Sequence, residues 1–109
     1  MSRYRERERD LEYMGRVKAL RCLLADVEGA GPCGGAVEAD HAGTRAFGLK
    51  APDDTCIPLC TVHHRDRTDM RGFFRSFDRW RMRQWCDAAV EATRGVLQRT
   101  AASSGEIPW

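Results

Sequence analysis

A set of cysteine and histidine residues limits which folds this chain can adopt. Cys60 and His63 form a C-x2-H pair within the stretch IPLCTVHH, and Cys22 and Cys33 bracket a loop rich in glycine and proline. Two further thiolates added to a C-x2-H pair complete a tetrahedral zinc site, which leaves no position for a substrate. The sequence therefore predicts a structural zinc site formed by these four residues. The alternative for Cys22 is a buried apolar role, because its spacing from Cys33 is long for a zinc-binding pair.

The length and the cysteine count of the chain agree with this prediction. At 109 residues, the chain has the size of one small domain, for which a hydrophobic core alone gives marginal stability and a metal site adds to it. No apolar run resembles a signal peptide or a membrane span. We therefore expect a cytoplasmic protein with no membrane partner, in which the cysteines are reduced. We expect Cys56 and Cys86 to pack in the core as small hydrophobic residues.

Hydrophobic periodicity predicts an α+β fold. It indicates a helix over residues 4–20, short strands at AVEADH and TCIPL, and a helix at TVHHRDRTDM. Pro58 marks the second strand as an edge or as a strand end. Apolar residues at helical spacing then predict one long amphipathic helix near the C-terminus. We divide the single domain into an N-terminal helix (1–21), a zinc-binding core (22–72), a C-terminal helix (73–100) and a flexible tail (101–109).

His64 is left over by the predicted zinc site. Successive residues on a helix point about 100° apart, so His63 and His64 should face different neighbours. A second cluster of Asp40, His41 and His64 suits metal-assisted hydrolysis of a phosphodiester. A divalent cation on Asp40 and His64 would polarise the phosphate, while His41 deprotonates the attacking water. An exposed ion pair is the alternative for Asp40 and His41, since this dipeptide alone is a weak motif.

The stretch VEADHAGTRAFGLKAPDDTCIPLCTVHH resembles the HNH endonuclease motif, also known as the ββα-metal or His-Me finger. It is most similar to a small phage and prophage branch that includes the DUF968 and Ref-type nucleases. The shared features are a cysteine-bearing loop, a histidine at the end of the first strand, a G-x-K-x-x-D stretch and PLC-x-x-HH at the start of the helix. The similarity spans residues 13–74. It implies a zinc-stapled ββα-metal core with flanking N- and C-terminal helices.

The resemblance also implies a role for each matching residue. His41 would be the general base, and His64 would bind the catalytic metal with Asp40 as its partner. We expect that metal to be Mg²⁺, Mn²⁺ or Ni²⁺. The polar residue that orients the general base in the family falls near Thr55, with Asp54 beside it.

Two classes of function follow. The first is an endonuclease that hydrolyses single- or double-stranded DNA with low sequence specificity. The second is a zinc-stabilised module of phage or prophage origin that binds nucleic acid or protein and has lost catalysis. Thr68 favours the second class, because many relatives carry another histidine there. A chain this short offers little surface for sequence readout, so targeting by a phage or host recombination or packaging protein is a further expectation.

The segment after the histidine pair is rich in arginine, which favours contact with phosphate groups. If this segment is helical, arginines at every fourth position form one basic stripe that can follow a nucleic-acid backbone. These residues are Arg71, Arg75, Arg79 and Arg83. Lys50 is a further expected phosphate contact, and Trp80 is the aromatic residue we expect to be exposed. The alternative is a solvated helix face whose arginines pair with nearby aspartates.

Overall fold

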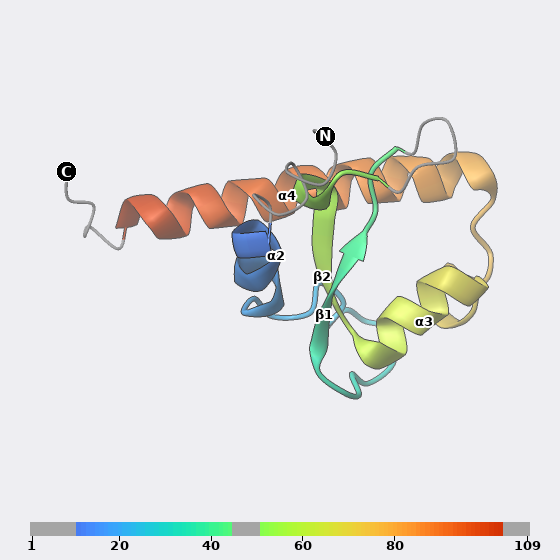
Figure 1. Ribbon diagram of the computed structural model, residues 1–109. Coiled ribbons are helices and arrows are strands. Elements are labelled where there is room, and N and C mark those ends of the chain that lie inside the picture. The colour runs from blue at the N-terminus through green and yellow to red at the C-terminus, as the bar shows by residue number, and fades with distance from the viewer. Residues whose placement is uncertain (1–10, 45–50, 104–109) are drawn as a thin grey trace.

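The described part of the chain runs as a helix, two strands and two further helices (Figure 1). This computed structural model describes residues 11–44 and 51–103, with side chains as far as residue 100. The elements are α2 (Leu11–Lys18), β1 (Val37–His41), the 3₁₀ helix η1 (Asp53–Thr55), β2 (Cys56–Cys60), α3 (Thr61–Asp69), the 3₁₀ helix η2 (Gly72–Phe74) and α4 (Arg79–Ser103). The predicted α+β class, both strands and the helix at TVHHRDRTDM are confirmed.

Strands β1 and β2 pair antiparallel, from Val37 opposite Cys60 to His41 opposite Cys56. Within residues 11–44 and 51–103 the sheet consists of these two strands, so each strand is an edge. Proline lacks the N–H that a central strand needs and is tolerated on an edge. The prediction that Pro58 marks an edge or a strand end is therefore confirmed.

The two faces of β1 have different neighbours, because side chains alternate along a strand. Glu38 and Asp40 lie on the face toward α3, where each contacts side chains of that helix. Ala39 lies on the other face and packs against a cluster that contains Val17 of α2. The sheet therefore presents two acidic side chains to α3.

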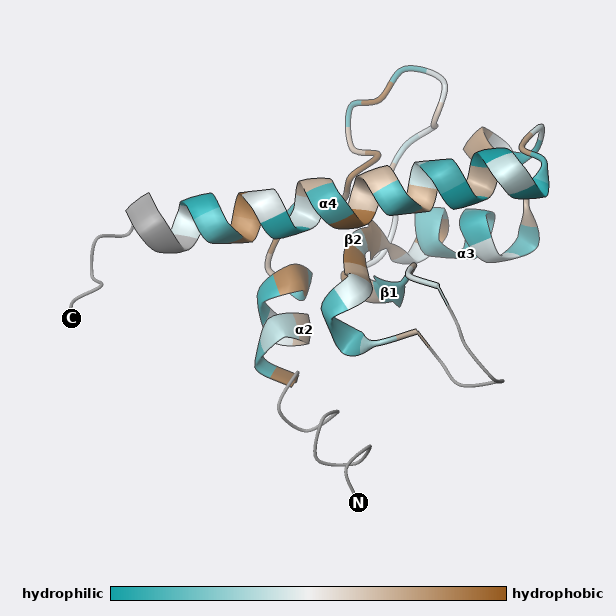
Figure 2. Ribbon diagram, turned by 90° about the horizontal axis from the view of Figure 1, so that it is seen from above, coloured by the Kyte–Doolittle hydropathy of each residue, from teal (hydrophilic) through white to brown (hydrophobic). Residues whose placement is uncertain are grey.

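The main core lies between β2 and the N-terminal half of α4. Phe74 is fully buried and packs edge-on against Trp85 of α4, with 4.9 Å between the ring centroids. Ile57 and Leu59 of β2 belong to the same cluster. Figure 2 shows β2 as a hydrophobic strand, while the ribbon of α4 alternates between hydrophilic and hydrophobic residues. Burial of large apolar side chains on this scale is the main stabilising contribution in a small domain.

A second, smaller core holds α2 against the sheet and against the distal part of α4. Its buried residues are Val17, Cys56 and Leu97. Arg16 of α2 also donates a hydrogen bond to the Leu97 carbonyl, at 2.9 Å. Cys56 is 0 % exposed, and Cys86 in the main core is 1 % exposed, so the prediction that both pack as core residues is confirmed. Of the helix predicted over 4–20, the part before residue 11 lies outside the described residues.

The helix predicted over 73–100 begins later than expected. Gly72 adopts a positive φ of 56°, and the chain then makes the short turn η2, which buries Phe74. Helix α4 begins only at Arg79, where Asp78 caps it by accepting a hydrogen bond from the Arg81 N–H, at 2.7 Å. The prediction of a continuous helix from residue 73 is therefore wrong, because tertiary packing of Phe74 overrides the helical spacing. Helix α4 continues to Ser103, three residues past its predicted end, and residues 104–109 of the predicted tail lie outside the described residues.

Candidate metal centre

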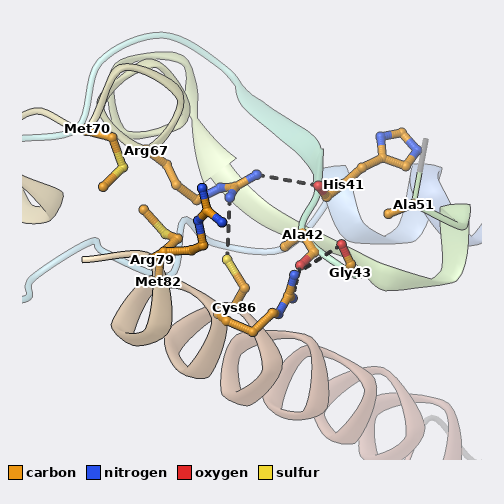
Figure 3. Close-up of a pocket in the computed structure, with 10 residues that line it drawn as sticks. His41, Ala42, Gly43, Ala51, Arg67, Met70, Arg79, Met82 and Cys86 are labelled. Carbon is orange, nitrogen blue, oxygen red and sulfur yellow. Dashed lines mark hydrogen bonds between the residues drawn. The ribbon is translucent and has the colours of Figure 1, made fainter. Parts of the chain in front are cut away.

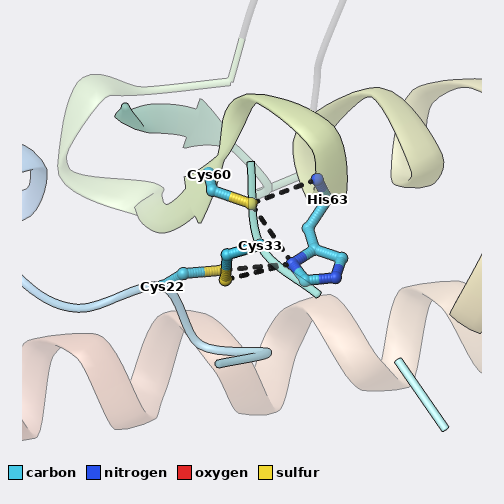
Figure 4. A group of neighbouring side chains, drawn as sticks. All are labelled: Cys22, Cys33, Cys60 and His63. Carbon is cyan, nitrogen blue, oxygen red and sulfur yellow. Dashed lines mark hydrogen bonds between the residues drawn. The ribbon is translucent and has the colours of Figure 1, made fainter. Parts of the chain in front are cut away.

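Four side chains from three segments converge on one point (Figure 4). Cys22 and Cys33 lie in the loop between α2 and β1, Cys60 ends β2, and His63 lies in the first turn of α3. Their ligand atoms all lie within 4.8 Å of one another. His63 Nδ1 is 3.4 Å from Cys22 Sγ, 3.6 Å from Cys33 Sγ and 3.3 Å from Cys60 Sγ. The four residues predicted from the sequence thus form one site that could hold a metal ion.

The dimensions of this site suit zinc. Zinc binds thiolate sulfur at about 2.3 Å and histidine nitrogen at about 2.0–2.1 Å. Tetrahedral angles then separate the nitrogen from each sulfur by about 3.5 Å. The separations of 3.3 to 3.6 Å around His63 Nδ1 lie close to this value. Four protein ligands fill a tetrahedral shell, so this arrangement suits a structural metal rather than a catalytic one.

Cys60 is placed where a thiolate is stabilised. It caps the N-terminus of α3, and its Sγ accepts hydrogen bonds from the backbone N–H groups of His63, at 3.4 Å, and Gly34, at 3.5 Å. Burial raises the pKa of Cys60, but these donors outweigh it and bring the pKa down to about 7. Desolvation and the neighbouring Cys60 and Cys22 thiols raise the pKa of Cys33 to about 12. Since zinc binds thiolates, Cys60 is the cysteine best prepared to receive the metal.

The ring of His63 is held in the orientation that metal binding requires. His63 is fully buried, and its Nε2–H donates to the Ala30 carbonyl, at 2.9 Å. Such a bond fixes the tautomer and leaves Nδ1 free as the ligand atom. The loop that carries Cys33 passes close to α3 at Gly35, which has a φ of 81° and where a Cβ would collide with Thr61. A glycine is therefore required for the loop to reach the site.

His64 points to a different side of α3 from His63, as predicted. Its Nδ1 is 2.6 Å from Glu38 Oε1, and its Nε2 is 3.5 Å from Asp40 Oδ1. A carboxylate can only accept a hydrogen bond, so Nδ1–H donates to Glu38, and Nε2 is the ring nitrogen directed at Asp40. The bond from His64 is the main reason that the pKa of Glu38 is lowered. Sequence reasoning missed Glu38, although its position two residues before Asp40 places both carboxylates on one face of the strand.

Asp40 is buried, and Arg67 of α3 holds it. Arg67 Nε donates to Asp40 Oδ2 and Nη2 donates to Oδ1, both at 2.6 Å. Burial lowers the pKa of Arg67, but the bonds to Asp40 offset this and raise it above its usual value. Arg67 follows His64 by three residues, so both reach the same carboxylate from one helix face. Sequence reasoning did not predict this pair.

The His41 side chain is paired with Asp53, a residue that sequence reasoning did not assign to the site. His41 Nε2 is 2.7 Å from Asp53 Oδ1, and Asp53 is buried in the turn η1. Asp54 points outward and pairs with Arg94, with 3.5 Å between the charged groups. The Thr55 hydroxyl bonds backbone groups of the surrounding loop instead. Thr55 contacts the backbone directly after His41, where its carbonyl accepts from the Ala42 N–H, at 3.2 Å, so its orienting role stays a prediction, whereas the Asp54 carboxylate pairs with Arg94.

The expected cluster of Asp40, His41 and His64 forms only in part. Asp40 and His64 meet beneath α3, but alternation along β1 turns the His41 ring to the other face. Figure 3 shows this ring pointing away from Arg67, near Ala51. The end of β1 therefore carries two separate histidine–carboxylate pairs. The prediction of one cluster of three residues is corrected accordingly. Glu38, His64 and the exposed Thr68 line an open hollow of 350 Å³ on the α3 side.

The predicted basic stripe does not form. Arg71 and Arg75 precede α4, and Arg71 lies 3.6 Å from Asp69. Arg83 lies on α4 but donates a hydrogen bond to the Ala42 carbonyl. Of the four arginines in the predicted stripe, Arg79 is therefore the one that lies on α4 without this bond. Lys50 lies outside the described residues. Trp80 is 69 % exposed, as predicted.

No family model, curated protein or solved structure matches this chain. Among the described helices, none is both long and apolar enough to cross a bilayer.

Proposed function

We propose that this chain is a metal-dependent HNH endonuclease that hydrolyses DNA phosphodiester bonds with low sequence specificity. The observation that carries the proposal is the approach of His64 to Asp40, with Glu38 holding the other ring nitrogen of His64. Histidines that bind metals commonly donate their second ring N–H to a carboxylate. Glu38 and His64 have this arrangement, and the order of β1, β2 and α3 matches the ββα core that the resemblance implies.

Asp40 and His64 are the residues that would hold the catalytic cation. Two ligands at about 2.1 Å from one cation are separated by about 3.0–3.4 Å at octahedral or tetrahedral angles. The 3.5 Å between Asp40 Oδ1 and His64 Nε2 is close to this range. A carboxylate and an imidazole suit Mn²⁺ and Ni²⁺ as well as Mg²⁺. When bound there, the cation would polarise the scissile phosphate and stabilise the leaving oxygen.

His41 is the proposed general base. Asp53 accepts the Nε2–H, so the Nδ1 lone pair of His41 is available to take a proton from water. A buried carboxylate behind an imidazole holds its tautomer and favours the imidazolium that forms. Asp53 is thus a positioning residue in this proposal. His41 immediately follows Asp40, which keeps the proposed base and the proposed cation site at the same end of β1.

A second function is favoured by one specific contact. Arg67 engages both oxygens of Asp40, and its guanidinium already supplies the positive charge that a cation would bring. Together with the threonine at position 68, this contact supports a zinc-stabilised binding module without catalysis. For the chain to act as a nuclease, Arg67 must share or release Asp40. A cleavage assay separates the two functions.

The test is cleavage of plasmid and single-stranded DNA by zinc-loaded protein, with Mg²⁺, Mn²⁺ and Ni²⁺ supplied in turn. The nuclease proposal expects metal-dependent cleavage that falls about 10²- to 10⁴-fold in His41→Ala, the range that general-base catalysis usually contributes. Asp53→Asn should also lower the rate, whereas Asp54→Asn, the neighbouring exposed carboxylate, should not. Cleavage unchanged in His41→Ala would exclude this mechanism. DNA binding without turnover in any of the three metals would establish the binding module instead.

A further inference from the structure

A cavity of 570 Å³ lies between the end of β1, α3 and the first turns of α4 (Figure 3). Its walls include the guanidinium-bearing residues Arg67, Arg79 and Arg83, and among the residues that the structure describes no carboxylate lines it. Met70, Met82 and Cys86 supply an apolar wall. A cavity of this size matches a ligand of one nucleotide rather than a protein or a duplex. Its lining combines groups that bind phosphate with a surface that accepts a base or a sugar.

The three arginines of the cavity differ in what holds them. Arg67 is bound to Asp40 and donates to Cys86 Sγ, at 3.4 Å. Arg83 donates to the carbonyls of Ala42 and Gly43, next to the end of β1. Among the contacts of the described residues, Arg79 has no acceptor, and it is exposed at the start of α4. Two guanidinium groups are therefore fixed as walls, and the third is available for an anionic ligand.

We propose that this cavity binds one unpaired nucleotide of the substrate, with Arg79 on its phosphate and Met70 and Met82 against its base or sugar. The proposal deepens the nuclease function, on which it rests, because it names a single-stranded or unpaired segment as the form of nucleic acid that the site receives. A base within a duplex is stacked and paired, so it reaches such a cavity only at the energetic expense of unstacking. The cavity is lined by His41 and by Arg67, which binds Asp40, so its nucleotide would lie beside the proposed site.

The test measures binding without cleavage, so it does not depend on the nuclease activity. The protein is the full chain carrying His41→Ala, with its methionine methyl groups labelled with ¹³C for NMR. Thymidine monophosphate and an eight-nucleotide oligothymidylate are the probes. We expect the methyl signals of Met70 and Met82 to shift and that of Met14, which packs in the second core, to remain in place. If the probes bind but the methyl signals of Met70 and Met82 do not shift, the proposal is overturned.

Arg79→Gln and Arg99→Gln on the same background form a matched pair, because each removes one exposed arginine from α4. Fluorescence anisotropy with the single strand should show weakening of about tenfold in Arg79→Gln and little change in Arg99→Gln. A duplex of equal length should bind more weakly than the single strand. Equal losses in the two variants, or equal affinity for duplex and single strand, would overturn the inference. Absence of cleavage in the parent chain, with these shifts present, would count against the nuclease proposal alone.

Discussion

Glu38 shows how much of the candidate site depends on one side chain outside the sequence motif. Its carboxylate accepts from both His64 Nδ1, at 2.6 Å, and the Thr61 hydroxyl, at 2.9 Å. The bond from His64 lowers the pKa of Glu38. Its carboxylate therefore stays charged below the usual range and releases His64 only when the pH falls through that lowered pKa. Across neutral pH, Glu38 holds the His64 ring with Nε2 directed at Asp40.

We predict that Glu38→Gln weakens binding of the proposed cation at Asp40 and His64 by about 10- to 100-fold, the usual effect of removing such a supporting carboxylate. The measurement is the dependence of the cleavage rate on Mn²⁺ concentration, with zinc content determined on the same sample. Zinc content should not change, because Glu38 lies outside the set of four zinc ligands. Glu91→Gln, an exposed glutamate on α4, is the control. An identical Mn²⁺ dependence in the two variants would contradict the role of Glu38.

The four residues of the candidate metal site could be predicted from the sequence, whereas the partners of the two remaining histidines could not. Cys60 and His63 are neighbours on one helical turn, so their spacing alone indicates a shared ion. Asp53 and Arg67 act through contacts between separate elements, 12 and 27 residues from their partners. The turn η1 determines that Asp53, rather than Asp54 or Thr55, faces inward. Periodicity in the sequence cannot predict the orientation of side chains in a turn of three residues.

At the scale of elements, the N-terminus of α4 decides where the basic residues lie. Asp78 Oδ1 accepts the Arg81 N–H, at 2.7 Å, which satisfies one donor that the helix cannot pair internally. We predict that Asp78→Ala lowers the free energy of unfolding by about 1 kcal/mol, the typical effect of losing such a cap. Urea denaturation followed by circular dichroism measures it. Asp87→Ala, whose aspartate pairs with Arg83 on the helix surface, should cost less. Equal losses would refute the capping role.

Periodicity predicted β1, β2 and α3 correctly, because the alternating and helical patterns of their own residues agree with the packing that they adopt. Cys60 ends β2 and caps α3, and Met70 ends α3 in the left-handed conformation, with a φ of 54°. The segment between α3 and α4 also has boundary residues, Gly72 with a positive φ and the helix cap Asp78, but the apolar spacing concealed them. Its phenylalanines are spaced for a helix but pack around Trp85 instead, with Phe74 fully buried. Burial of these rings outweighs the small helical preference of the local sequence.

At the scale of the whole molecule, the candidate metal site adds to the backbone hydrogen bonds and core contacts that join the loop after α2 to β2 and α3. A two-stranded sheet is marginally stable alone and needs a helix or another layer against it. The four ligands link the loop after α2 to the junction of β2 and α3. That junction also positions His64 against β1. Zinc binding should therefore stabilise the fold and, through the first turn of α3, the proposed cation site.

We predict that removal of zinc unfolds most of this chain, because the binding energy of a structural zinc contributes directly to folding in small domains. A strong zinc chelator, or Cys60→Ser, should abolish the cooperative thermal transition seen by circular dichroism, with zinc content falling in parallel. Cys86→Ala is the matched control. It removes a cysteine that is equally buried but lies outside the ligand set, so it should lose stability while retaining its zinc. If the chelator removes the zinc and the thermal transition does not change, the four residues do not hold the fold together. In that case the strand pairing, the loop hydrogen bonds and the aromatic core would be enough to orient His64 and Glu38.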